Sequence, residues 1–216
     1  HLTVRPGQIV AIAGSSGSGK SLLASAILGI LPENAVVQGH LHYKGQELTP
    51  AMQQRLRGHE IALVPQSVAF LDPLMKVGAQ ADGTLRPKPA EKRGKIFDRL
   101  HLPPQTPQLY PFQLSGGMAR RVLVSTALIT DAELIIADEP TPGMSLDQAL
   151  EALRMFRELA DAGKAVILIT HDIDLAVEFA DRVAVFYAGT TVETAPAATA
   201  APAPAVTEAP APAAAL

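Results

Sequence analysis

The sequence predicts an α/β fold built on a parallel core sheet, and three observations support this. Short apolar runs suited to buried strands alternate with stretches of helical periodicity. A glycine-rich loop joins the first apolar run to a helix-like stretch. Three later runs lead into polar residues, namely Gln66, the pair Asp138-Glu139, and His171. Because open parallel sheets bind ligands at the carboxyl ends of their strands, we expect these side chains at one edge of the sheet.

The composition limits the classes to which the chain can belong. With 216 residues, 48% of them hydrophobic, it is long enough for one core and a small subdomain. The net charge of −3 gives no basic footprint for nucleic acid, and the lack of cysteine removes disulfides and thiolate metal sites. No apolar run approaches the ~20 residues of a spanning helix, so the chain is not expected to cross a membrane by itself.

The glycine-rich loop carries the strongest single motif. It reads Gly14-Ser15-Ser16-Gly17-Ser18-Gly19-Lys20-Ser21, between a predicted strand at residues 8–13 and a helix running to about residue 31. This G-x-x-x-x-G-K-[ST] spacing is typical of a loop that binds a nucleoside triphosphate. Glycines let the backbone approach the phosphates, Lys20 supplies charge to the β- and γ-phosphates, and Ser21 is a predicted Mg²⁺ ligand. A flexible linker would need neither the lysine nor the flanking strand and helix.

The first part of the chain also predicts antiparallel strands. Residues 2–4 and 8–13 are expected to form two strands joined by a turn at Arg5-Pro6-Gly7, and residues 36–48 a hairpin. His40 and His42 share one face of that hairpin. We interpret them as a solvated strand face rather than a metal site, because no third ligand is apparent.

Gln66 follows a predicted buried strand at residues 61–64. Its position suits either a ligand contact or an ordinary polar loop residue, and spacing alone does not decide between them. From residue 67 to 112 strand character is weak, and helix-like pieces at residues 74–81 and 90–100 indicate a helical insertion.

Ser115-Gly116-Gly117 precedes a predicted helix at residues 119–128, with Ser115 as its N-cap. A serine and two glycines at a helix start favour either a second anion-binding terminus or a simple capped helix. The neighbouring Arg120-Arg121 is either a solvated face or a longer-range influence on the phosphates.

The run at residues 134–139 predicts a buried strand with two carboxylates at its carboxyl end. In a chain that already carries a phosphate loop, Asp138 is expected to hold Mg²⁺, and Glu139 to orient or deprotonate an attacking water. An amphipathic core helix is predicted at residues 146–160.

His171 follows another buried strand, at residues 165–170. Its convergence with the other strand ends favours a phosphate-contacting role, whereas the remaining five histidines are given no functional role. A helix at residues 177–180 and a strand at residues 183–187 are expected next. Residues 194–216 are a low-complexity stretch rich in Ala and Pro, predicted to be extended or disordered.

Taken together, these motifs resemble the ATP-binding subunit of ATP-binding cassette (ABC) transporters. In the family's terms they are a Walker A loop, a Q-loop at Gln66, a signature at residues 114–118, a Walker B strand and a switch histidine at His171. The resemblance covers residues 1–193, and residues 70–75 and 110–118 are similar to the peptide/nickel importer branch. The loop after Glu139 is longer than its family counterpart, which leaves the role of Asp147 open.

The resemblance implies a P-loop NTPase (RecA-like) parallel-sheet core with an antiparallel β subdomain and a helical insertion. It implies one nucleotide-binding domain over residues 1–193, with the helical subdomain at about 67–117, followed by the tail at 194–216. ATP and Mg²⁺ are the implied cofactors, with Gln66 sensing both Mg²⁺ and the γ-phosphate. The catalytic residues are then Glu139, His171 and Gln66, the metal ligands are Ser21, Gln66 and Asp138, and the nucleotide is held by Gly14, Ser15, Ser16, Gly17, Ser18, Gly19, Lys20 and Ser21.

The resemblance also implies partners and a location. Two ATPase subunits, alike or different, would form a head-to-tail dimer in which Ser115-Gly116-Gly117 closes the partner's ATP site. Separate transmembrane permease subunits would import a peptide or nickel, delivered by an extracytoplasmic solute-binding protein, with this chain peripheral at the cytoplasmic face of the membrane. Nucleic acid is not an expected partner. The alternatives are a soluble ABC-type ATPase, for which the insertion is too short to hold coiled coils, and a non-catalytic nucleotide-binding module.

Overall fold

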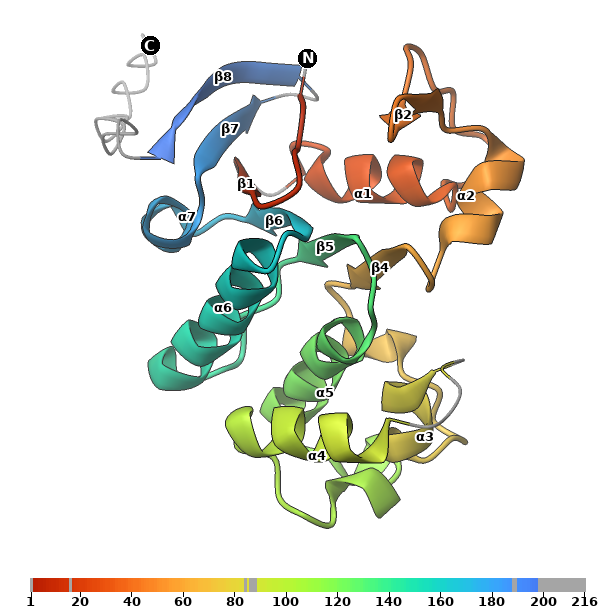
Figure 1. Ribbon diagram of the computed structural model, residues 1–216, viewed down its shortest axis with the longest axis vertical. Helices are drawn as coiled ribbons and strands as arrows, with labels where there is room; N and C mark the ends of the chain where they lie inside the picture. The colour runs from red at the N-terminus through yellow and green to blue at the C-terminus, as the bar shows by residue number, and fades with distance from the viewer. Residues whose placement is uncertain (1, 16, 84, 86–88, 188–189, 198–216) are drawn as a thin grey trace, which may run out of the picture.

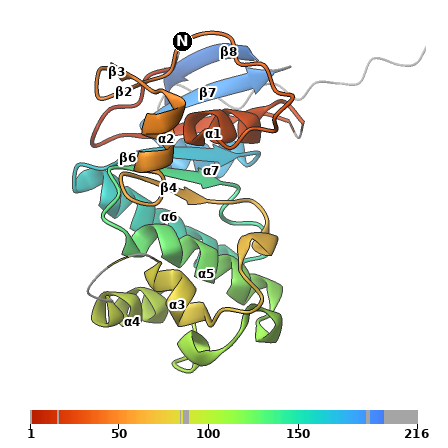
Figure 2. The same cartoon turned by 90° about the vertical axis from the view of Figure 1, so that its right-hand side faces the viewer.

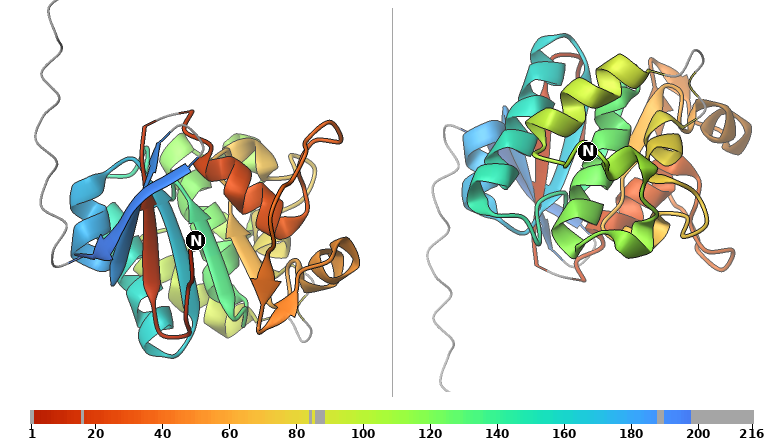
Figure 3. Two further views of the ribbon diagram at one scale, coloured as in Figure 1. Left: turned by 90° about the horizontal axis from the view of Figure 1, so that it is seen from above. Right: turned by 90° about the horizontal axis from the view of Figure 1, so that it is seen from below.

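The computed structural model describes residues 2–15, 17–83, 85, 89–187 and 190–197. Its main feature is a six-stranded sheet in the order β4-β5-β6-β1-β7-β8. All neighbouring pairs are parallel except β7 and β8, which are antiparallel. Figure 3 shows the strands side by side, with β1 (red) among them. The strands are β1 (Ile9–Ala13), β4 (Ile61–Val64), β5 (Leu134–Asp138), β6 (Ala165–Thr170), β7 (Arg182–Tyr187) and β8 (Thr190–Pro196).

Helices cover both faces of this sheet because its central strands are apolar on both sides. Along β5, Ile135 and Ala137 pack toward one helical layer, while Leu134 and Ile136 pack toward the other, as the two-residue period of a strand requires. The first layer holds α5 (Gly116–Ile129) and α6 (Leu146–Asp161), and the second holds α1 (Lys20–Leu28) and α2 (Pro50–Leu56). In Figure 1 α5 and α6 are drawn below the sheet, and α1 and α2 to the upper right of β4 and β5. The predicted parallel α/β core is therefore confirmed.

The segment between β4 and β5 is helical and packs on α5. It contains α3 (Val77–Asp82) and α4 (Ala90–Arg99), whose apolar side chains join the same core cluster as α5. Figure 2 shows α3 and α4 at the end of the molecule opposite β8. Three short 3₁₀ turns complete the segment, at Val68–Phe70, Thr106–Gln108 and Pro111–Gln113. The last helix, α7 (Ile173–Phe179), packs beside β1 and β7. Within the described residues, no helix combines the length and apolarity needed to cross a bilayer.

Of the two strand predictions near the start of the chain, that of a strand at residues 2–4 is wrong, and that of an antiparallel hairpin is confirmed over a shorter range. Residues 2–4 form no strand, because both edges of β1 are already paired, with β6 and β7. The hairpin predicted at residues 36–48 is reduced to β2 (His42–Tyr43) and β3 (Gln46–Glu47), joined by Lys44-Gly45 with positive φ at both positions. Val36 is 84% exposed, so burial of apolar side chains does not extend the hairpin to residue 36.

The end of the core differs from the predicted boundary at residue 193. Strand β8 continues to Pro196, and Thr194, Ala195 and Pro196 pair with the first residues of β7. An exposed edge strand tolerates proline, which explains why a composition rich in Ala and Pro did not stop the pairing. The rest of the predicted tail, residues 198–216, lies outside the described residues.

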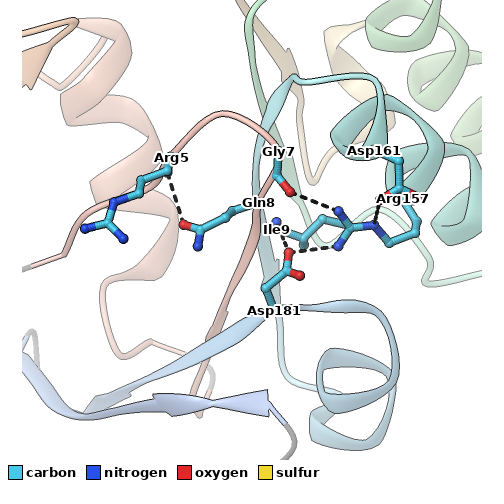
Figure 4. Close-up of polar contacts among 7 residues, drawn as sticks. All are labelled: Arg5, Gly7, Gln8, Ile9, Arg157, Asp161 and Asp181. Carbon is cyan, nitrogen blue, oxygen red and sulfur yellow. Dashed lines mark hydrogen bonds and ion pairs between the residues drawn. The ribbon is translucent and has the colours of Figure 1, made fainter.

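The amino-terminal edge of the sheet is held by a network of charged groups around Arg157 (Figure 4). Arg157 donates from Nη1 to Asp181 Oδ2 at 2.8 Å, from Nε to Asp161 Oδ1 at 2.9 Å and from Nη2 to the Gly7 carbonyl at 3.1 Å. The Ile9 amide donates to the same Asp181 oxygen at 2.7 Å. Burial alone would raise the pKa of Asp181, but these donors outweigh it and lower that pKa below its usual value.

Candidate functional site

The sheet order brings the predicted site residues to one edge. β5 lies between β4 and β6, β6 pairs with β1, and all four strands are parallel. Their carboxyl ends therefore lie side by side and lead into Gln66, Asp138-Glu139, His171 and the Gly14–Ser21 loop. The expectation that these residues gather at one edge is confirmed.

The glycines of the loop between β1 and α1 serve different purposes. A Cβ atom on Gly14 would overlap the backbone carbonyl of Phe186 on β7, so only glycine fits there. Gly17 and Gly19 have φ of 79° and 96°, a left-handed conformation that glycine adopts without strain. Gly19 is also the N-cap of α1, where backbone amides begin the helix. Ser16 lies outside the described residues.

Lys20 is buried inside this loop. Its Nζ donates to the carbonyls of Gly14 at 2.7 Å and Ser15 at 2.9 Å, and lies 3.5 Å from the hydroxyl of Ser18, which is also buried. The ammonium group thus sits at the centre of the loop, beneath the first turn of α1. A compact charge in this position can attract an anion that binds over the loop.

Asp138 ends β5, is 5% exposed, and has an Oδ1 atom that lacks a hydrogen-bond partner among the described residues. Burial raises the pKa of this carboxyl and the Glu139 carboxylate adds to the rise, while a hydrogen bond from Ser21 and the charges of Lys20 and Arg120 oppose it. An unpartnered carboxylate oxygen beside a hydroxyl is a donor set that suits Mg²⁺. Within the described residues, no group of three or more His, Cys, Asp or Glu could hold a metal ion by itself.

Glu139 is held in a strained backbone conformation. Its φ is 48°, unusual for a residue with a side chain, and its amide donates to the Ile169 carbonyl at 2.9 Å. The carboxylate is buried, and its Oε2 lies 2.9 Å from Nδ1 of His171, whose ring is exposed. A fixed carboxylate paired with an exposed imidazole can orient a water or accept its proton.

Gln66 lies immediately beyond β4 and is exposed. Asp147, whose role the sequence left open, is exposed in the first turn of α6, and Ser145 caps that helix. The structure thus puts a serine, not an aspartate, at the point where the loop after Glu139 enters the helix.

Ser115-Gly116-Gly117 forms the start of α5, as predicted. Ser115 is the N-cap, and its hydroxyl accepts a hydrogen bond from the Met118 amide at 3.3 Å. Because α5 and α1 cover opposite faces of the sheet, the start of α5 lies on the other face from the helix that follows the Lys20 loop of its own chain. Ser115 and Gly116 are exposed and accessible to another molecule.

The role of Arg120 could not be decided from the sequence, which left two interpretations open. Its Nη1 donates to the Pro65 carbonyl at 3.0 Å, and its Nε is buried without a partner among the described residues. Burial lowers the pKa of Arg120, while the carboxylates of Asp138 and Glu139 raise it. Arg121 instead donates to the Leu100 and His101 carbonyls, at 2.8 Å each, and so fastens the helical segment to α5. In the sequence, the only indication of these contacts was the arginine pair itself.

A strand–loop–helix unit with a buried lysine, facing a buried aspartate at the end of a nearby strand, defines a P-loop nucleotide-binding domain. Residues 1–142 match the family model described as "ABC transporter". The chain therefore belongs to the ABC transporter family.

Curated relatives agree with this assignment. A Brucella melitensis protein is 36% identical over 211 residues, which cover 91% of this chain and 64% of that protein. The oligopeptide transport ATP-binding protein OppD of Mycobacterium tuberculosis is 38% identical over 209 residues, 89% of this chain and 34% of the relative. The dipeptide transport ATP-binding protein DppD of Lactococcus lactis is 34% identical over 203 residues, 87% of this chain and 58% of the relative. The chain thus spans two thirds or less of the length of these relatives.

Solved structures share the fold. A dimeric structure of a bacterial ABC transporter cassette has a TM-score of 0.80 at 24% identity, over 91% of this chain and 88% of that one. A dimeric post-hydrolysis state of an ATP-binding cassette, bound to ADP and Pi, has a TM-score of 0.79 at 25% identity with the same coverage.

Proposed function

We propose that this chain is the ATP-hydrolysing domain of an importer's ATP-binding subunit. The observation that carries the proposal is the pairing of a buried lysine loop with Asp138, Glu139 and His171 at one edge of the sheet. The reaction is transfer of the γ-phosphoryl group of ATP to water, giving ADP and phosphate. Catalysis of this kind rests on positioning and charge stabilisation, and the site supplies both.

Each part of the site has a role in this proposal. The loop from Gly14 to Ser21, Ser16 included, binds the phosphates through its backbone amides and Lys20. Ser21, Asp138 and Gln66 would hold Mg²⁺, which would supply positive charge to the phosphates. Glu139 orients the attacking water and accepts its proton, and the contact of 2.9 Å with His171 holds the Glu139 carboxylate in place. His171 would also contact the γ-phosphate of bound ATP.

The proposed active unit is a head-to-tail dimer, of two copies or of two similar ATPases. The exposed start of α5, with Ser115, Gly116 and Gly117, would close the ATP site of the partner through its helix terminus. Its position on the face of the sheet opposite α1 supports a role in trans. The similar cassette that was solved with ADP and Pi is itself a dimer, which also supports this arrangement.

The proposed partners are the transmembrane permease subunits of an importer, with this chain at the cytoplasmic face of the membrane. The names of relatives as oligopeptide and dipeptide transport proteins support a peptide as the solute. Nickel rests on the branch resemblance alone, as does an extracytoplasmic solute-binding protein. A soluble ABC-type ATPase and a non-catalytic nucleotide-binding module are the competing functions.

Glu139→Gln tests hydrolysis directly. The variant is expected to keep its ATP affinity within about threefold and to lose at least ~100-fold in phosphate release, since a positioned base contributes that much. Glu178→Gln is the matched control, because it makes the same change at an exposed position on α7. Unchanged phosphate release in Glu139→Gln would remove Glu139 from the mechanism. A wild-type chain that binds ATP without hydrolysing it, with or without permease, would support the non-catalytic module.

A further inference from the structure

The first two turns of α5 contact both loops that carry the site of their own chain. A Cβ atom on Gly117 would lie 2.9 Å from the carbonyl of Gly143, in the loop that follows Glu139. One turn further along the helix, Arg120 donates to the carbonyl of Pro65, in the loop that holds Gln66. The helix that presents Ser115 at its start is therefore in contact with the loop after β5 and the loop after β4.

The bond to Pro65 acts on Gln66 through a rigid unit. The Pro65 carbonyl and the Gln66 amide belong to one planar peptide group, so fixing the carbonyl oxygen also fixes the orientation of the Gln66 N–H. Proline restricts the same loop further through its fixed φ. The guanidinium group is partly buried, and the negative charges of Asp138 and Glu139 favour its charged form.

We propose that Arg120 is a positioning residue that locks the Gln66 loop to α5, so that the loop of one ATP site and the Ser115 terminus serving the partner's site move together. The inference rests on the proposed function and deepens it, since it gives each dimer a physical link between its two sites. Helix α5 is a continuous 14-residue helix with a buried apolar face, so a displacement at Arg120 is passed to Ser115 as a rigid-body motion.

The test compares Arg120→Met with Arg120→Lys in the full 216-residue chain. Methionine keeps an apolar stem but no donor, whereas lysine keeps a charged donor of similar reach. Arg154→Met is the matched control, because Arg154 is an exposed arginine on α6 whose ion pair with Glu151 spans 3.9 Å. Steady-state ATP hydrolysis and amide hydrogen exchange are measured on all four proteins, at a temperature where each is folded.

In Arg120→Met, we expect kcat to fall about tenfold with KM for ATP changed less than threefold, as loss of one charge-assisted hydrogen bond at a positioning contact predicts. Amide exchange should rise in both residues 66–70 and residues 115–118. Arg120→Lys should recover at least half of both effects, and Arg154→Met should show neither. If Arg120 had a purely structural role, Arg120→Met would change thermal stability without lowering kcat more than it changes KM.

Two outcomes separate failure of the link from failure of the function. If the wild type hydrolyses ATP and Arg120→Met changes neither kcat nor exchange at residues 66–70, the link is wrong. If the wild type hydrolyses no ATP, but exchange still rises in both segments and lysine restores it, the link stands and the proposed ATPase falls. Should Arg120→Met fail to fold, Arg120→Gln takes its place, because glutamine is uncharged and too short to keep the full reach of arginine. Faster exchange at residues 66–70 then supports the link, and exchange equal to that of Arg154→Met overturns it.

Discussion

The two ends of the central sheet use the same residue types for opposite purposes. At the amino-terminal edge, Asp181 accepts hydrogen bonds from Arg157 and from the Ile9 amide, and its pKa is lowered. At the carboxyl edge, Asp138 keeps a buried oxygen without a partner among the described residues, and its pKa is raised. A satisfied carboxylate stabilises the fold, whereas an unsatisfied one is available to a ligand. The difference supports the proposal that the carboxyl edge is the functional end, without reference to motifs.

The two edges of the sheet also differ in backbone conformation and in the partners of their charged side chains. Near Arg157 the charged side chains are paired, because Arg157 and Asp161 on α6 contact each other and Arg157 also contacts Asp181, which precedes β7. At the other edge, Glu139 has a positive φ and Lys20 donates to the carbonyls of its own loop. Strain and weakly satisfied polar groups of this kind are typical of sites that gain their best interactions only when a ligand binds.

Asp138→Asn should give the largest effect and leave stability nearly unchanged. Loss of the proposed charged Mg²⁺ ligand is expected to lower Mg²⁺-dependent ATP hydrolysis by at least ~100-fold. The free energy of unfolding should stay within about 1 kcal/mol of wild type, because the substitution also removes an incompletely satisfied buried charge. Chemical denaturation and phosphate release measure the two quantities. Asp131→Asn, at an exposed aspartate, is the control. A loss of more than about 3 kcal/mol would show that Asp138 stabilises the fold as Asp181 does.

Arg157→Met should show the reverse pattern. Three hydrogen bonds are lost, and because Asp161 and Asp181 are partly exposed, the expected destabilisation is only about 2 kcal/mol. The affinity for ATP should change by less than about twofold, since the network lies at the opposite edge of the sheet. Denaturation and calorimetric titration of ATP provide the two values. An ATP affinity that fell together with stability would mean that the two edges are coupled.

The same variant has a defined pH dependence. The pKa of Asp181 is lower in the folded than in the unfolded chain, so its contribution is fully present above the unfolded pKa of about 3.9 and is lost as pH falls through the folded value. The stability difference between wild type and Arg157→Met should therefore be constant above about pH 5 and shrink below about pH 4. A difference that is the same at pH 6 and pH 3 would exclude Asp181 as its source.

Local signals were enough to predict the core strands and the loop. β4 and β6 have the predicted bounds, because their apolar runs end at Pro65 and at His171-Asp172. The capping serine of α5 was also predicted, since its N-cap chemistry is local. These features depend on residues close together in the chain, which is why the sequence alone reveals them.

Long-range pairing was what the sequence could not show. Residues 2–4 have strand composition but no place in the core sheet, and β8 pairs despite its proline. Neither outcome is visible without the sheet order. Two contacts near the site could not be predicted from the sequence for the same reason. The contact from Arg120 to Pro65 joins residues 55 positions apart, and the close approach of Gly117 to Gly143 depends on how α5 packs.

The central claim is that the carboxyl edge of the sheet binds ATP through the Lys20 loop. Calorimetric titration of ATP into wild type, Lys20→Met and Lys92→Met tests it most directly, Lys92 being a partly exposed lysine paired with Asp131. Lys20→Met is expected to bind ATP at least ~100-fold more weakly, as the loss of two charge-assisted bonds to phosphate predicts, while Lys92→Met binds like the wild type. Equal affinities in all three proteins would contradict the account.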